Sequence, residues 1–210
     1  NIYCTIKYTC CSLMMSMAVT VGVAQEKIAD RLNTPAALEN MKMRGLWSQS
    51  KNAAGALLDY SFRYASADLE YRFYDGNFRR PQQGESGNNV VFDTEGGGKV
   101  KDFFAWGSFN YSRDKVKEAN FNSSIIDPYR GMPYYTADTN VSNWNNQHYR
   151  LKMRVATPQF WNFLSFGLDG YYQNSVGAKQ RDMRTKSVFY TIIVRPGVVL
   201  SAGKNHRFGL

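Results

Sequence analysis

The most regularly spaced charged side chains in this chain alternate with apolar ones. Such alternation is typical of a β-strand with one face in contact with water, called the wet face below. Arg150, Lys152 and Arg154 occupy every second position of one segment, and acids alternate in the same way further upstream. Such groups could bind or filter a polar solute, or they could pair their charges across neighbouring strands. The charged residues expected on this wet face are Asp68, Glu70, Arg72, Asp93, Glu95, Arg150, Lys152 and Arg154.

Acid–base, metal and phosphate chemistry find little support in the residue spacing. The two histidines, His148 and His206, lie far apart near predicted strand ends, and no HExxH or GxSxG motif occurs. Gly96-Gly97-Gly98 could be mistaken for a phosphate cradle, but no GK[ST] and no helical pattern follow it. A bulge or turn is therefore expected at these glycines. The sequence predicts no catalytic residue, no cofactor, no metal site and no enzyme activity.

The elements that must position the charged residues are strands with a period of two. In Gln147–Gln173 the cations face one way and apolar residues the other, and the pattern resumes after a turn at Pro158–Asn162. Two amphipathic strands of about ten residues joined by a tight turn are the repeating unit of a transmembrane β-barrel. The residues expected to face lipid are Leu69, Tyr71, Phe73, Tyr149, Leu151, Met153, Val155, Leu164, Phe166 and Leu168.

Composition agrees with strands and disagrees with membrane-spanning helices. Mean hydropathy is -0.46, and no apolar run approaches the ~20 residues that a transmembrane helix needs. A barrel strand needs apolar residues only at alternate positions. The aromatic content of 15% favours a barrel, since barrels carry aromatic girdles at both membrane interfaces.

The amino terminus is expected to be a secretory signal peptide over residues 1–24, with a buried first helix as the alternative. Lys7 precedes an apolar stretch from Leu13 to Val23, and a small-x-small cleavage site precedes Gln25. All three cysteines lie inside this segment, so the mature chain is expected to hold no disulfide. Cleavage would lower the net charge from +9 to +8. The cations show neither a basic helix nor zinc-finger spacing, so nucleic acid is not expected as a partner.

The rest of the chain is expected to run through a periplasmic lead-in over residues 25–52, with a short helix over Ala36–Met43, into barrel strands over residues 53–210. The segment from Asn52-Ala53-Ala54-Gly55 to Tyr64 is either a first short strand or an inward-tucked segment. Further strands are predicted over residues 67–73, 90–95, 102–113, 147–157, 163–173 and 188–200, with another beginning at His206. The connections alternate between long (76–89, 115–146, 174–187) and short (96–102, 158–162, 202–205), as a membrane topology with long extracellular loops requires.

Four segments carry a resemblance to a known group of proteins: Asn52-Ala53-Ala54-Gly55, Tyr71-Arg72-Phe73, the strand from Phe104 to Tyr111, and Asp127-Pro128-Tyr129. In these the chain resembles a Bacteroidetes-type family of outer-membrane β-barrel proteins of unknown function. The resemblance implies an antiparallel up-and-down transmembrane barrel, of which about seven or eight strands are present. It also implies that the chain is the amino-terminal part of a longer barrel.

The expected function is that of an integral outer-membrane barrel of a Gram-negative bacterium, which passes or docks a polar solute alongside an uptake receptor. The expected partners are outer-membrane lipid and lipopolysaccharide, the outer-membrane assembly machinery, and that neighbouring receptor. The alternative is a secreted, soluble all-β binding module such as a lectin-like sandwich. The two differ in the apolar face, which a sandwich would bury against a second sheet and a barrel would leave outside.

Overall fold

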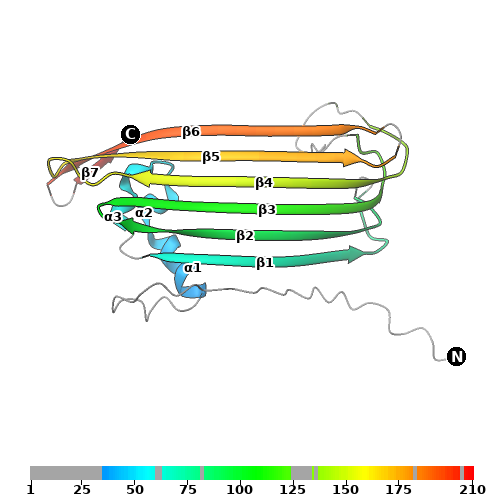
Figure 1. The fold of residues 1–210 in the computed structure, drawn as a ribbon, viewed down its shortest axis with the longest axis horizontal. Helices are drawn as coiled ribbons and strands as arrows, with labels where there is room; N and C mark the ends of the chain where they lie inside the picture. Colours follow the sequence, from blue (N-terminus) through cyan, green and yellow to red (C-terminus); the bar gives the residue numbers. More distant parts are fainter. Residues whose placement is uncertain are drawn as a thin grey trace, which may run out of the picture.

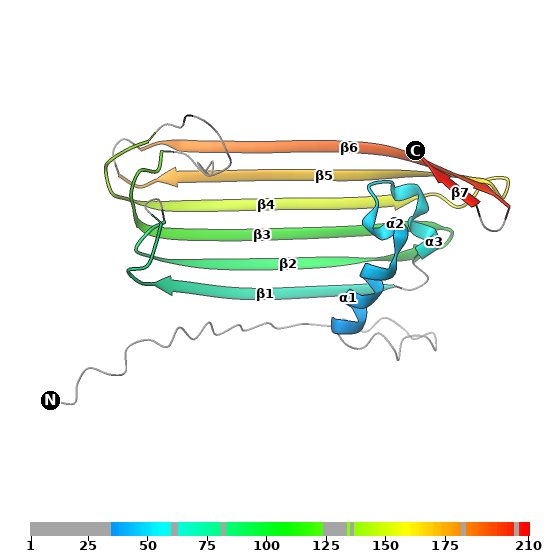
Figure 2. The same ribbon diagram turned by 180° about the vertical axis from the view of Figure 1, so that it is seen from behind.

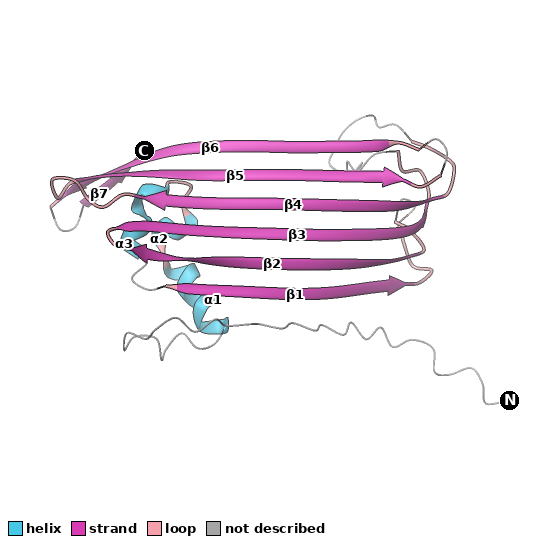
Figure 3. Ribbon diagram, viewed as in Figure 1, coloured by secondary structure: helices cyan, strands magenta, loops and turns pink. Residues whose placement is uncertain are grey.

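The computed structural model describes residues 35–59, 63–80, 83–123, 134, 137–181, 184–203 and 206–210. The predicted signal peptide and the lead-in as far as residue 34 lie outside the described residues. The described part consists of one large antiparallel sheet and a short helical segment that packs on one of its faces (Figure 3).

The sheet has seven strands, and each pairs with its neighbours in the sequence, in the order β1-β2-β3-β4-β5-β6-β7 (Figure 1). The strands are β1 Tyr64–Asp75, β2 Ser86–Val100, β3 Phe103–Ala119, β4 Ser142–Ala156, β5 Leu164–Lys179, β6 Lys186–Ala202 and β7 His206–Gly209. The prediction of an all-β, up-and-down antiparallel sheet is confirmed. The sheet is not closed into a barrel, because β1 and β7 stand at opposite ends of the strand order.

The helical segment comprises α1 Pro35–Arg44, α2 Leu46–Gln49, the 3-10 helix η2 Ala53–Gly55 and α3 Ala56–Asp59. Figure 2, which views the sheet from behind, shows it lying across one face near the amino-terminal end of β1. The predicted helix over 36–43 is confirmed by α1. The segment from Asn52 tucks inward, so the prediction of a first short strand there is wrong. Within the described residues, no helix has the length and apolar character needed to cross a membrane.

Small residues allow the helical segment to approach the sheet closely, and this contact is the buried core. Ala53, Ala54 and Ala56 are buried. Beneath them lie glycines of the sheet: a methyl group added at Gly167 would stand 2.6 Å from the Ala54 Cα, and one at Gly197 would stand 2.8 Å from the Asn52 Cγ. The tuck therefore depends on glycine in β5 and β6.

The prediction of a bulge or turn at Gly96-Gly97-Gly98 is wrong, because β2 continues through these glycines to Val100 without a break in register. The chain reverses at Lys101 and Asp102, with Lys101 in the left-handed region at φ 55°. The glycines have a packing role instead. Gly97 pairs directly with Trp106, and a methyl group added at Gly97 would stand 2.7 Å from the Trp106 Cδ1. The missing side chain makes room for the indole.

The connections at the two ends of the sheet differ in length, though less regularly than predicted. Residues 76–85, 120–141 and 180–185 connect strands at one end, and residues 101–102, 157–163 and 203–205 at the other (Figure 1). Strict alternation fails at 180–185, which is no longer than 157–163. The polar stretch from Asn174 to Lys179, predicted as loop, extends β5 because its residues pair with β4 and β6.

Candidate functional site

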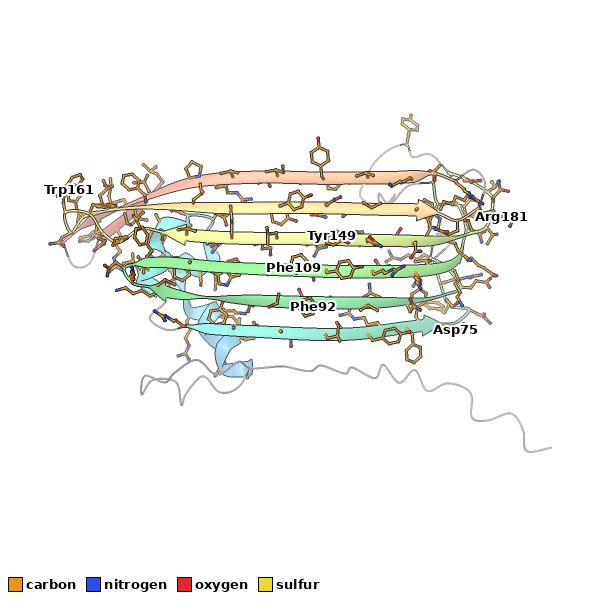
Figure 4. The ribbon with its side chains drawn as sticks, in the orientation of Figure 1. Asp75, Phe92, Phe109, Tyr149, Trp161 and Arg181 are labelled. Atoms are coloured by element: carbon orange, nitrogen blue, oxygen red, sulfur yellow. The ribbon has the colours of Figure 1, made fainter. Side chains whose placement is uncertain are left out.

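The strand register places apolar side chains of neighbouring strands on one continuous face. Leu69 lies opposite Phe92, Phe92 opposite Tyr111, and Tyr111 opposite Tyr149. Directly opposed residues of antiparallel strands point to the same side of the sheet, so the apolar parity is preserved from strand to strand. Figure 4 labels Phe92 and Tyr149 among the side chains of this sheet. We call this side the apolar face and the opposite side the polar face.

All ten residues predicted to face lipid share the parity of the apolar face, and all eight predicted wet-face charges share that of the polar face. The apolar side chains remain exposed: Leu69 by 49%, Met153 by 45% and Ile192 by 65%. Ile192 was not among the predicted residues, although alternation in β6 was a signal that could have found it. It belongs with Val188, Tyr190 and Val194, which are also exposed on the same face.

Most charges of the polar face are grouped by sign on different strands, with Arg72 on β1 as an exception. The acids Asp68, Glu70, Asp93 and Glu95 stand on β1 and β2, whereas the cations Arg150, Lys152 and Arg154 stand on β4. The intervening strand β3 presents Ser108, Asn110 and Ser112 between them. Asp68 lies directly opposite Asp93, and the Asn110 Nδ2 donates to the Asp93 Oδ1 at 2.6 Å. Arg72 pairs with Glu70 on its own strand.

One predicted cation, Arg154, joins the polar face to the helical segment. Its Nη1 donates to the Ser48 carbonyl at 2.8 Å and its Nη2 to the Ser50 carbonyl at 2.9 Å. Its Nε lies 3.2 Å from the Asp169 Oδ1, and the Arg195 Nη1 lies 2.5 Å from the other oxygen of the same carboxylate. Asp169 is only 5% exposed. Asp169 was not among the predicted charged residues, and no local spacing links it to Arg154 and Arg195.

Further hydrogen bonds hold the helical segment against the strands. The Asn52 Nδ2 donates to the Val198 carbonyl at 3.0 Å and to the Leu210 carbonyl at 2.8 Å. The Ser165 hydroxyl donates to the Ala54 carbonyl at 3.2 Å. Together with Arg154, these contacts attach residues 48–54 to β4, β5, β6 and the end of the chain.

The first helix is tied to β2 by an ion pair between Lys42 and Glu95. Burial lowers the pKa of Lys42, but the hydrogen bond and charge of Glu95, with a smaller contribution from Glu39, outweigh it and leave that pKa above its ordinary value. The Lys42 ammonium also lies 5.7 Å from the centre of the Tyr64 ring. Glu95 is therefore a contact residue of α1 as well as a polar-face acid.

A cavity of about 620 Å³ lies between α1–α2 and the polar face. Its walls include Trp106, Lys152, Tyr171 and Arg195 from the sheet. Trp106 is fixed in place: its Nε1–H donates to the Tyr64 hydroxyl at 2.7 Å, and the Arg154 guanidinium lies 5.9 Å from the ring centre. The cavity thus combines aromatic surface with cations from three elements, a lining suited to a polar ligand.

His148 lies between a serine and an acid, an arrangement that resembles a hydrolytic triad. Its Nδ1 is 2.8 Å from the Ser175 Oγ, and its Nε2 is 3.4 Å from the Asp114 Oδ2. However, Ser175 is only 4% exposed, and it lies inside a continuous β4–β5–β6 ladder that engages the nearby backbone amides. An acyl-transfer site needs a reachable nucleophile and amides free to stabilise the oxyanion. The three residues are better explained as a hydrogen-bonded link between β3, β4 and β5.

Among the residues that the structure describes, no group of three histidine, cysteine, aspartate or glutamate side chains is placed to hold a metal ion. Comparison of the chain with curated proteins and with solved structures found no match. Comparison with protein-family models found one over residues 53–210, described as a family of unknown function (DUF6850). This range begins at the tucked 3-10 helix and includes all seven strands. The chain therefore belongs to the family of unknown function DUF6850.

Proposed function

We propose that the seven-stranded sheet is part of the wall of an outer-membrane β-barrel that docks or passes a polar solute at its polar face. The observation that carries this proposal is the apolar face, which continues through successive strands and stays exposed. Large exposed apolar surfaces in a protein mark contact with a membrane or a partner. Here the apolar surface follows the alternate positions along part of every long strand, as lipid contact requires.

The dimensions and borders of the apolar face support lipid as its occupant. Along β1 the band runs from Ala65 to Phe73, and eight steps of ~3.3 Å give roughly 26 Å, close to the ~25 Å of barrel apolar bands. At one end of the band β3 presents Lys115, which is level with Phe73 across the ladder, and Lys117, which lies two residues beyond it. At the other end Trp161 is exposed in the connection 157–163, where an amphipathic ring suits the membrane interface.

The polar face supports the solute part of the proposal. It carries charged side chains on β1, β2, β4, β5 and β6, and the helical segment covers only one end of it (Figure 2). In a closed barrel this face would line a wet interior. The cavity beneath α1 and α2 would then be a binding site for the solute inside the barrel.

The alternative of a soluble lectin-like sandwich needs a second sheet packed on the apolar face. All strands of the described chain belong to one sheet, and the helical segment packs on the polar face instead. Leu151, Met153 and Val155 are consequently more than 40% exposed. This exposure favours the barrel.

The proposed setting is the outer membrane of a Gram-negative bacterium of the Bacteroidetes type. The partners would be outer-membrane lipid and lipopolysaccharide, the assembly machinery that inserts barrels, and a neighbouring uptake receptor. Cations near the end of the sheet with the connections 120–141 and 180–185, among them Arg181 and Lys186, would meet the anionic headgroups.

Cell fractionation tests this proposal. The full-length natural protein, expressed with its own leader in a Gram-negative host, should sediment with the outer membrane and resist extraction with alkaline carbonate. Its electrophoretic mobility in mild detergent should change on boiling, as that of folded barrels does. Recovery in the soluble periplasm, with no change of mobility, would remove the proposal.

A further inference from the structure

We infer that the cavity beneath α1 and α2 is a binding site for a small organic anion, one that carries a carboxylate or phosphate group on a ring or planar body. This inference deepens the proposed function, on which it rests, by specifying the chemistry of the polar solute. Three features of the cavity carry this inference. Its lining has an excess of positive charge, two of its cations have hydrogen-bond donors that are not engaged within the protein, and its aromatic side chain Trp106 is held in place by a hydrogen bond.

The cavity walls hold more positive than negative charge. Four cations line them, Lys42, Lys152, Arg154 and Arg195, against two acids, Glu95 and Asp169, so the net charge of the lining is four minus two, or +2. The ion pair with Glu95 neutralises Lys42. Arg154 and Arg195 share the single carboxylate of Asp169. One guanidinium charge and the whole charge of Lys152 are therefore left without an acid.

Lys152 is the cation most available to a ligand. Within the described chain it makes no ion pair and no side-chain hydrogen bond, and it is exposed. Its direct neighbours across the ladder are Ser108 on β3 and Tyr171 on β5, both neutral. An ammonium without a partner at the wall of a cavity is a ready donor to an anion.

Arg195 can complete the anion site from the other side. Its Nη1 is engaged by Asp169, and its side chain remains 34% exposed, so its other nitrogens can still donate. Lys152 stands on β4 and Arg195 on β6, two strands away at ~4.8 Å per strand and two positions further along the ladder at ~3.3 Å per residue, so their backbones are roughly 12 Å apart. Both side chains are long enough for their heads to approach one anionic group between them.

The aromatic wall indicates an organic ligand in preference to a bare inorganic ion. Trp106 and Tyr171 line the same cavity as the two cations. The hydrogen bond to Tyr64 holds the Trp106 indole in one orientation, so stacking on it costs little side-chain entropy. The cavity volume of about 620 Å³ would accommodate a ring-sized body with its charged head at Lys152 and Arg195.

Equilibrium dialysis of the refolded full-length chain in a zwitterionic detergent tests the inference. The probes are radiolabelled glucose 6-phosphate and glucuronate, which present a phosphate and a carboxylate on a sugar ring, with neutral glucose for comparison. Saturable binding is expected for at least one anionic probe. Lys152→Gln should weaken it at least tenfold, because the main cation is lost. Arg150→Gln, which removes one charge from the same face of β4 outside the cavity, should weaken it less than about twofold.

The outcomes separate the two proposals. Equal losses in the two variants would show a diffuse field effect and overturn the site, as would the absence of saturable binding of both anions to the unmodified protein. Circular dichroism melting of each variant shows whether a loss comes from misfolding. Because dialysis in micelles and cell fractionation are separate measurements, failure of anion binding removes the anion site and leaves the membrane proposal standing. Failure of fractionation removes the membrane setting, and with it the role of the bound anion as the barrel's solute.

Discussion

Replacing Arg154 by methionine should release the helical segment from the sheet while leaving the sheet intact. The guanidinium donates to the carbonyls of Ser48 and Ser50, and methionine keeps much of the side-chain volume without any donor. Asp169 would retain Arg195 as its partner, so the sheet keeps its own ion pair. The substitution should therefore weaken mainly the attachment of residues 48–54 to the sheet.

The expected magnitude follows from the two lost hydrogen bonds. Bonds to a charged group contribute about 1.5–3 kcal/mol each. The Arg154 side chain is 19% exposed, so water can replace part of what is lost, and a total of about 2–4 kcal/mol is reasonable. At about 1.4 kcal/mol per factor of ten, the detached population should rise roughly 30- to 700-fold.

Native-state proteolysis can measure this population. Lys51 is exposed, but the residues on both sides of it, Ser50 and Asn52, are held to the sheet. Trypsin should therefore cut after Lys51 mainly in the detached state, at a rate that follows the detached population when reattachment is fast. Arg150→Met is the matched control, because Arg150 lies on the same face and strand without a contact to the segment. Equal cleavage rates in the two variants would refute the role assigned to Arg154.

The remaining predictions address the face, the loop and the histidine. Met153→Arg should destabilise the membrane-inserted protein by roughly 2–4 kcal/mol, and Lys152→Met far less, as chemical unfolding in liposomes would show; equal effects would contradict the face assignment. The pKa of Asp138 is lowered, first by its hydrogen bond from Lys179 and then by one from the Asn140 amide. Its contribution to stability is therefore complete above about pH 4 and lost as the pH falls through the lowered value; hydrogen exchange should show protection of the Asn140 amide declining over that range, and a flat profile in Asp138→Asn. Ser175 should not react with a fluorophosphonate probe, because it is buried within the β4–β5–β6 ladder. Labelling of the protein that Ser175→Ala abolishes would instead support a hydrolytic triad of Ser175, His148 and Asp114.

The alternation of residue types was sufficient to predict the sheet and its two faces. Tyr149 to Val155 and the cations between them carry an unambiguous period of two, and a shift of register by one residue is excluded because each strand must keep one parity. The helix over 36–43 was predictable in the same local way. Such features depend on residues that are close in the sequence.

Strand ends and long-range contacts were not predictable from local pattern. Gly96-Gly97-Gly98 has the composition of a turn, and only the Trp106 indole on the next strand explains why glycines continue β2. The polar stretch from Asn174 to Lys179 looks like loop until β4 and β6 supply its ladder partners. The attachment of the helical segment through Arg154, Asp169 and Arg195 joins residues about a hundred positions apart, for which a single sequence offers no signal.

The most direct test of the membrane proposal measures which face of β4 meets hydrocarbon. Single cysteines at Leu151, Lys152 and Met153, in a background without other cysteines, are labelled with an environment-sensitive fluorophore, and the protein is reconstituted in liposomes containing spin-labelled lipid. Fluorescence at positions 151 and 153 should be quenched by the lipid-borne label, whereas that at position 152 should be quenched by aqueous iodide. Equal access of iodide to all three positions, with no quenching by lipid, would contradict the assignment of the apolar face to the bilayer.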